Sequence, residues 1–254
     1  PQLHSGGWYD SYTRTTFENF VGLSQRKKGP IRLLVGPWTH GQRSVSFAGD
    51  VDFGPTATLD GNLGENWNDF RTMWFDTWLK DLGTGVKEQP PMLLFIMGGG
   101  DGRKNAQGRM NHGGYWRFEN EWPLARAERT RYYLHSDGRA HSPSEQGVLS
   151  VEPPVDERPD VYLYDPQAPV STLGGPLCCG GVPLPDGPKN HAEKEERADI
   201  LVYSTPELEE DVEVTGPVTI SLWASTSAAD TDFTGMLLDV RPCGCAVNLT
   251  DGIV

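Results

Sequence analysis

The chain has 254 residues and a mass of 28.0 kDa, and 37% of its residues are hydrophobic, which is enough to build a core. Acidic residues outnumber basic ones by 35 to 22, and the formal net charge of -13 disfavours binding to DNA or RNA. The longest apolar run is Met92 to Met97, whereas a membrane-spanning helix needs about 20 such residues, so we expect no membrane span.

The first part of the chain predicts a helix followed by a strand. Phe17, Phe20 and Val21 have the i, i+3, i+4 spacing of an amphipathic helix, which Gly29-Pro30 should end. The run 31–35 then predicts a buried strand. We expect this strand to end at Gly36-Pro37 and to display residues 38–40 in the following loop, because proline interrupts a central strand.

A second helix is predicted by aromatic residues that recur at helical spacing, namely Trp67, Phe70, Trp74 and Trp78. Asn62 and Glu65 are placed as a capping box at its start, and Gly83 is placed to stop it. A stripe of this kind usually packs against a core, so we interpret it as a packing surface rather than a cofactor site.

From about residue 90 the pattern changes to short apolar or alternating runs separated by Gly, Pro, Asp and Asn clusters. The predicted strands are residues 92–97, 131–135, 161–164, 200–203, 218–223 and 233–240. Residues 1–90 carry 9 basic and 10 acidic side chains, while residues 91–254 carry 13 and 25. We therefore predict a strand-helix-strand unit over residues 1–90 and an all-β sandwich or jelly roll over residues 91–254.

Asp10 and His40 are the first candidates for catalysis. His40 comes just after the predicted strand, and Asp10 follows another strand pattern 30 residues earlier. Loops at the carboxyl ends of neighbouring parallel strands converge, so the two side chains could meet. Such a pair can activate a serine hydroxyl, with the carboxylate orienting the imidazole. Spacing alone favours the alternative, in which His40 is an ordinary hydrogen-bonded loop residue.

Ordered motifs along the whole chain resemble one enzyme family. They are Gly7-Trp8-Tyr9-Asp10, Val35-Gly36-Pro37-Trp38-Thr39-His40, the segment 74–80, Glu121-Trp122-Pro123-Leu124, Tyr132-Tyr133-Leu134-His135, Tyr164-Asp165-Pro166, the segment 172–175, Tyr203-Ser204-Thr205, the segment 213–216, Asp230-Thr231-Asp232-Phe233 and Asp251-Gly252-Ile253. In this order they resemble the family of cocaine esterase, α-amino-acid ester hydrolases and X-Pro dipeptidyl-peptidases.

The resemblance implies a serine hydrolase that cleaves ester or amide bonds through a Ser-His-Asp triad. It implies that Asp10 and His40 are the acid and the base of that triad, and that the chain combines the last part of an α/β-hydrolase sheet with a jelly roll. Tyr12, Cys178 and Cys179 would lie near the bound substrate, although a packing or plain loop role is the alternative for each. The sequence has no G-x-S-x-G motif for the nucleophile, so we expect a fragment that is inactive alone.

The sequence also bears on metals, cofactors and binding partners. The cysteines, Cys178-Cys179 and Cys243-x-Cys245, lack a zinc-site spacing, and we favour unliganded thiols with no metal and no cofactor. The expected partner is a small-molecule ester, amide or peptide substrate. The alternative function is a β-sandwich module that binds carbohydrate or protein without catalysis.

The remaining expectations concern the state of the chain in solution. Incomplete sheets expose strand edges, so we expect the isolated chain to be poorly stable or to form homo-oligomers. The sequence leaves the substrate and the cellular location open, with a soluble cytoplasmic protein slightly favoured.

Overall fold

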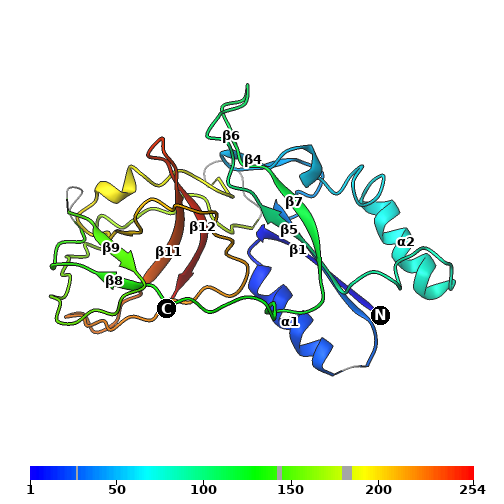
Figure 1. Cartoon of the computed structure of the whole chain (residues 1–254), viewed down its shortest axis with the longest axis horizontal. Helices are drawn as coiled ribbons and strands as arrows, with labels where there is room; N and C mark the ends of the chain where they lie inside the picture. The colour runs from blue at the N-terminus through cyan, green and yellow to red at the C-terminus, as the bar shows by residue number, and fades with distance from the viewer. Residues whose placement is uncertain (27, 142–144, 179–184) are drawn as a thin grey trace.

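The computed structural model describes residues 1–26, 28–141, 145–178 and 185–254. Figure 1 shows two groups of elements. On the right lie the helices α1 (Thr13–Gln25) and α2 (Trp67–Leu79) with the strands β1 (Gln2–Tyr9), β5 (Met92–Met97) and β7 (Gly114–Glu119). On the left lie β8 (Tyr133–His135), β9 (Gly147–Ser150), β11 (Thr234–Val240) and β12 (Ala246–Ile253).

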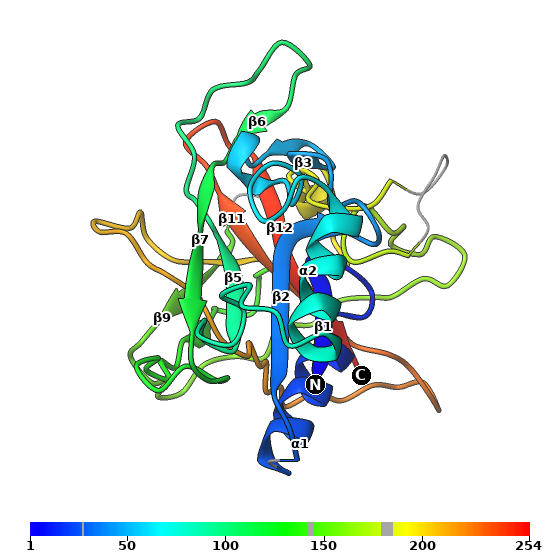
Figure 2. The same cartoon turned by 90° about the vertical axis from the view of Figure 1, so that its right-hand side faces the viewer.

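The sheet that positions the candidate site has the order β1-β2-β5-β7, where β2 covers Ile31–Thr39 (Figure 2). β1 and β2 are parallel, with Gln2 opposite Ile31, and β2 and β5 are also parallel. β7 pairs with β5 in the antiparallel sense. Parallel strands connected through α1 form the strand-helix-strand unit that the sequence predicted.

Both faces of β2 are buried from Leu33 onward, which explains its apolar run at residues 33–35. Leu33 faces a cluster that contains Phe17 and Phe20 of α1. Leu34, the next residue, faces the opposite side and packs in a cluster to which Trp67 of α2 contributes. The predicted helix around Phe17 is therefore confirmed, and the aromatic residue at the start of α2 serves packing as expected.

The predicted end of β2 at Gly36-Pro37 was wrong, because the strand continues to Thr39. Pairing between β2 and β5 stops at Val35. The missing backbone N–H of Pro37 therefore breaks no hydrogen bond between these two strands. On the other side the register with β1 shifts between Gly7 and Tyr9, and prolines are tolerated at such irregularities. Trp38 and Thr39 are consequently buried in the strand, and only His40 lies beyond it.

The boundaries of α2 also differ from the prediction. Asn66, not the pair of Asn62 and Glu65, caps the helix, and its side chain accepts hydrogen bonds from the amides of Asn68 and Asp69. The helix ends at Leu79, before Gly83, and Asp81 has the left-handed φ of 54° that redirects the chain.

The other strands form three small sheets. The sheet β3-β4-β6 contains Phe47–Ala48, Val51–Asp52 and Met110–Asn111, the sheet β10-β9-β8 adds β10 (Tyr203–Ser204), and β11 pairs with β12 in the antiparallel sense. Two single-turn helices, η1 (Pro55–Ala57) and η2 (Lys194–Glu196), lie in the connections. The predicted strands at 161–164 and 218–223 are wrong, because neither segment pairs with a neighbour among the described residues.

Two findings bear on the predicted division and on the cysteines. β5 and β7 lie beyond residue 90, yet they extend the first sheet, so the boundary at residue 90 stays a prediction. Cys243 and Cys245 are joined in a disulfide, which corrects the expectation of free thiols there, whereas Cys178 is an exposed free thiol. Cys179 lies outside the described residues.

In the described ranges, no helix has the length and apolarity needed to span a bilayer.

Candidate active site

Asp10 and His40 meet at the edge where the parallel strands β1 and β2 end. Asp10 directly follows β1, and His40 directly follows β2. The Nδ1 atom of His40 lies 3.2 Å from Oδ1 and 3.1 Å from Oδ2 of Asp10. The Asp10 residue is only 5% exposed, whereas 40% of the His40 side chain is exposed. The carboxylate is thus buried behind an imidazole that reaches solvent.

A tight turn fixes the carboxylate of Asp10. Its backbone amide donates to the carbonyl of Gly7 over 3.1 Å, and the amide of Tyr12 donates to Oδ1 over 2.9 Å. Gly7 is required because a Cβ atom there would lie 2.1 Å from the carbonyl oxygen of Trp38. The close approach of β1 to β2 at this glycine brings the two strand ends together.

The second ring nitrogen of His40 is available for chemistry. Within the described ranges, Nε2 of His40 has no hydrogen-bond partner, while Nδ1 faces Asp10. A carboxylate at Nδ1 favours the tautomer that carries its proton there and leaves Nε2 as an acceptor. The arrangement can therefore accept a proton at Nε2 and stabilise the resulting imidazolium.

Tyr12, for which the resemblance implies a place near the bound substrate, borders this pair. Its ring lies 5.3 Å from the His40 ring, edge to face, and 54% of the residue is exposed. Tyr12 can therefore offer an aromatic surface beside His40. Among the described residues, no hydrogen bond links the exposed Cys178 to Asp10 or His40, whereas Cys179 lies outside them.

Arg43 supplies positive charge close to the pair. Its Nε atom lies 3.4 Å from Oγ of Ser5, and its guanidinium stacks on the ring of Trp67. Burial lowers the pKa of Arg43, and the negative charge of Asp10 acts in the opposite direction. Sequence reasoning missed Arg43, since nothing in the spacing from His40 marks it.

The structure contains a second histidine-carboxylate pair that the sequence did not indicate. Nδ1 of His135 lies 2.6 Å from Oε1 of Glu157, and Nε2 lies 2.8 Å from the carbonyl oxygen of Glu152. The hydrogen bond to Glu157 raises the pKa of His135. Because both ring nitrogens are engaged, this pair is poorly suited to act as a general base.

Among the described residues, no group of three or more His, Cys, Asp or Glu could hold a metal ion.

Two known families match most of the chain. The family described as X-Pro dipeptidyl-peptidase C-terminal non-catalytic domain matches residues 84–254, which is more than half of the sequence. The family described as X-Pro dipeptidyl-peptidase (S15 family) matches residues 1–42, the range that contains Asp10 and His40. The β-rich character of the chain after residue 84 agrees with the first match.

Individual relatives align over the same length. Cocaine esterase of Rhodococcus sp. (strain MB1 Bresler) is 36% identical over 254 residues, which cover 100% of this chain and 40% of the relative. Two proteins provisionally named serine esterases, from Mycobacterium bovis and Mycobacterium tuberculosis, are each 26% identical over 258 residues, covering 97% of this chain and 34% of the relative. The chain thus spans less than half the length of these relatives. From these matches we conclude that it belongs to the cocaine esterase and X-Pro dipeptidyl-peptidase family.

Proposed function

We propose that this chain supplies the acid and the general base of a serine hydrolase that cleaves ester or amide bonds. The observation that carries the proposal is the placement of Asp10 within 3.1 Å of Nδ1 of His40, with Nε2 of His40 left without a partner in the described ranges. The names of the relatives, an esterase and two proteins provisionally named serine esterases, support the same class of reaction.

In the proposed reaction His40 takes the proton of a serine hydroxyl at Nε2 while the serine oxygen attacks the substrate carbonyl. The negative charge of Asp10 stabilises the imidazolium, which then gives its proton to the leaving alcohol or amine as the acyl-enzyme forms. Water repeats the cycle in the second half, with His40 again as the base. Every proton thus passes through one ring nitrogen of His40.

The nucleophile would be a serine outside this sequence, which contains no G-x-S-x-G motif. The parallel pairing of β1 with β2 and of β2 with β5 supports the view that this sheet is the last part of an α/β-hydrolase sheet. The paired strands after residue 130 support the proposed jelly roll, which would lie in the part of residues 91–254 that follows β5 and β7.

The substrate class that we propose is a small ester, amide or peptide. Tyr12 would border its acyl group, since the exposed ring stands against His40. A hydrophobic acyl group would gain from contact with this ring, whereas the charged face of Arg43 lies on the side of Ser5.

The test uses a fluorophosphonate, which labels only an activated serine, on the full-length protein that contains this chain. We expect rapid labelling of the wild type and essentially none of His40→Asn, because the serine then has no base. Asp10→Asn should slow labelling and turnover by up to about 10⁴-fold, since the amide favours the wrong tautomer. The 254-residue chain by itself should not be labelled.

The matched control is His135→Asn, which removes the other histidine-carboxylate pair. This variant should be labelled at the wild-type rate because His135 plays no part in the proposed reaction. If His40→Asn were labelled as fast as the wild type, His40 would not be the base and the proposal would be abandoned.

A further inference from the structure

The residues that precede the two candidate catalytic residues are paired with each other in the sheet. Tyr9 precedes Asp10, Thr39 precedes His40, and the register of the sheet pairs Tyr9 directly with Thr39. The register shift between Gly7 and Tyr9 isolates this last pair from the regular ladder before it. The position of Tyr9 therefore sets where Asp10 enters the site relative to His40.

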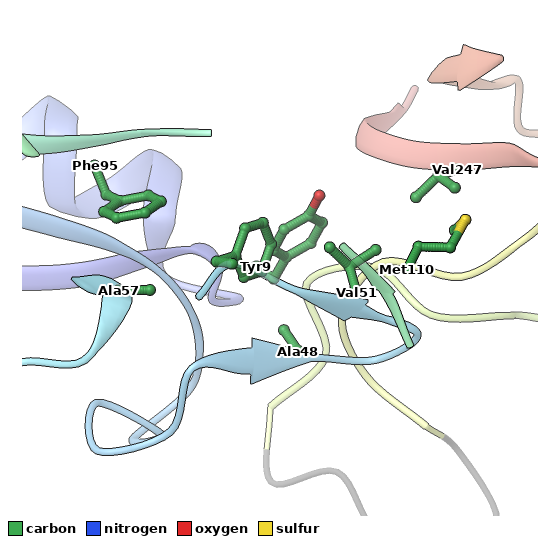
Figure 3. Packing of buried hydrophobic residues seen from close by; sticks show 8 residues of the cluster. Tyr9, Ala48, Val51, Ala57, Phe95, Met110 and Val247 are labelled. Carbon is green, nitrogen blue, oxygen red and sulfur yellow. The ribbon is translucent and has the colours of Figure 1, made fainter. Parts of the chain in front are cut away.

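Residues of β12, far away in the sequence, help to hold Tyr9 in place. Its ring is 1% exposed and lies in a buried cluster with Phe95 of β5 and Val247 of β12 (Figure 3). Its hydroxyl donates a hydrogen bond over 3.1 Å to the backbone carbonyl of Asn248, 239 residues away in the sequence. Burial raises the pKa of the Tyr9 hydroxyl, so it remains a protonated donor at neutral pH.

Asn248 is itself fixed. The residue is 1% exposed, and its Oδ1 atom accepts a hydrogen bond of 2.6 Å from the amide of Lys189. The Nζ atom of Lys189 in turn forms an ion pair of 2.6 Å with Asp50, which adjoins β4. The carbonyl that Tyr9 contacts thus belongs to a braced part of β12.

We propose that Tyr9 is a positioning residue through which β12, in the region matched by the non-catalytic C-terminal family, sets the Asp10 carboxylate against His40. This inference rests on the proposed function, in which the Asp10–His40 pair is catalytic. It assigns the C-terminal part a role in catalysis that its family description does not include.

The variant that tests the inference is Tyr9→Phe, which keeps the ring in its cluster and removes only the hydroxyl. In the full-length protein we expect kcat to fall about tenfold with KM nearly unchanged, since the base would be less well oriented. In proton NMR spectra of the same protein, the signal of the proton shared by Nδ1 of His40 and Asp10 should broaden or move upfield. The His40→Asn variant identifies that signal by its loss.

Tyr203→Phe is the matched control. The hydroxyl of Tyr203 also donates a hydrogen bond, 2.5 Å long, to Oδ2 of Asp160, but Tyr203 belongs to the sheet β10-β9-β8 and not to the sheet that contains β1. This variant should leave both kcat and the His40 signal unchanged. If Tyr9→Phe does not fold, Asn248→Ala provides the second route, because it removes the brace from Lys189 and should reduce kcat and alter the His40 signal in the same way.

The outcomes separate the two proposals. Wild-type kcat and an unchanged His40 signal in Tyr9→Phe would overturn the positioning role and leave the catalytic pair in place. The same result in Asn248→Ala would overturn it if Tyr9→Phe could not be measured. Full activity of His40→Asn would instead remove the proposed function itself.

Discussion

The guanidinium of Arg43 lies 4.5 Å from the centre of the Trp67 ring, which joins the loop after His40 to the first residue of α2. Contacts of this kind stabilise a protein by about 0.5 to 2 kcal/mol, depending on burial. We expect Arg43→Gln to lower the free energy of unfolding by about 1 kcal/mol, measured by urea denaturation. Arg71 lies farther from the same ring, at 5.4 Å, and is exposed, so Arg71→Gln serves as the control and should cost less. Equal losses would contradict the interpretation that Arg43 makes the stronger contact.

The cap of α2 gives a second prediction. The side chain of Asn66 accepts from the amides of Asn68 and Asp69, over 2.8 and 3.2 Å, and so satisfies two donors that the helix leaves open. Asn66→Ala should lower the free energy of unfolding by about 1 kcal/mol, whereas Asn66→Ser retains an acceptor and should restore most of it. The measurement is urea denaturation of both variants. A serine variant as unstable as the alanine variant would show that the loss has another cause.

A network of charged side chains around Arg117 and Glu119 of β7 gives a third prediction. Glu119 is 5% exposed and accepts hydrogen bonds from Arg117 and Arg126, which lower its pKa, with Arg126 as the larger cause. Glu119→Ala would leave two guanidinium groups without this acceptor, and we expect a loss of about 2 kcal/mol in the free energy of unfolding.

Glu213 is the matched position for that network. It also binds Arg117, which lowers the pKa of Glu213 to about 2, but 44% of its side chain is exposed. Because solvent screens exposed pairs, Glu213→Ala should cost under about 1 kcal/mol. Thermal or urea denaturation of the two variants measures both losses in unfolding free energy. A loss for Glu213→Ala as large as that for Glu119→Ala would mean that burial does not set the strength of this network.

From the sequence, topology indicated only that Asp10 and His40 could meet, and their assignment as a pair came from the resemblance to a known family, because spacing alone favoured an ordinary loop histidine. Two parallel neighbouring strands place the residues that follow them at one edge, whatever the details of the loops. The helix at Phe17 was predictable, since its apolar spacing is local and its two buried phenylalanines face one cluster.

Features that depend on distant partners could not be predicted in the same way. The continuation of β2 past Pro37 depends on where β5 stops pairing, and the pairing of His135 with Glu157 depends on a loop 22 residues away. The alternation at 161–164 favours a strand, but a ladder needs a second strand, and the described residues provide none there. The contact of Tyr9 with Asn248 spans 239 residues and leaves no local signal.

The last prediction concerns acid stability and His112. This residue is 5% exposed, and both of its ring nitrogens lack partners among the described residues. Burial, aided by the positive charge of Arg241, lowers the pKa of His112 from 6.5 to about 4. In the unfolded chain the imidazole returns to its ordinary pKa, so between these two values the unfolded state binds a proton that the folded state does not.

The folded state should therefore lose stability from His112 as the pH falls from about 6.5 to about 4, by about 3 kcal/mol in total. The full difference is reached near the folded pKa, because below it both states are protonated. His112→Gln cannot titrate, so the difference in unfolding free energy between the wild type and this variant should shrink by that amount across the window. Urea denaturation at pH 7, 5.5 and 4.5 measures this difference while the contributions of carboxylates cancel between the two proteins. A difference that stays constant over these pH values would mean that His112 is protonated in the folded protein near its ordinary pKa, and that the ring is reached by solvent or by an acceptor.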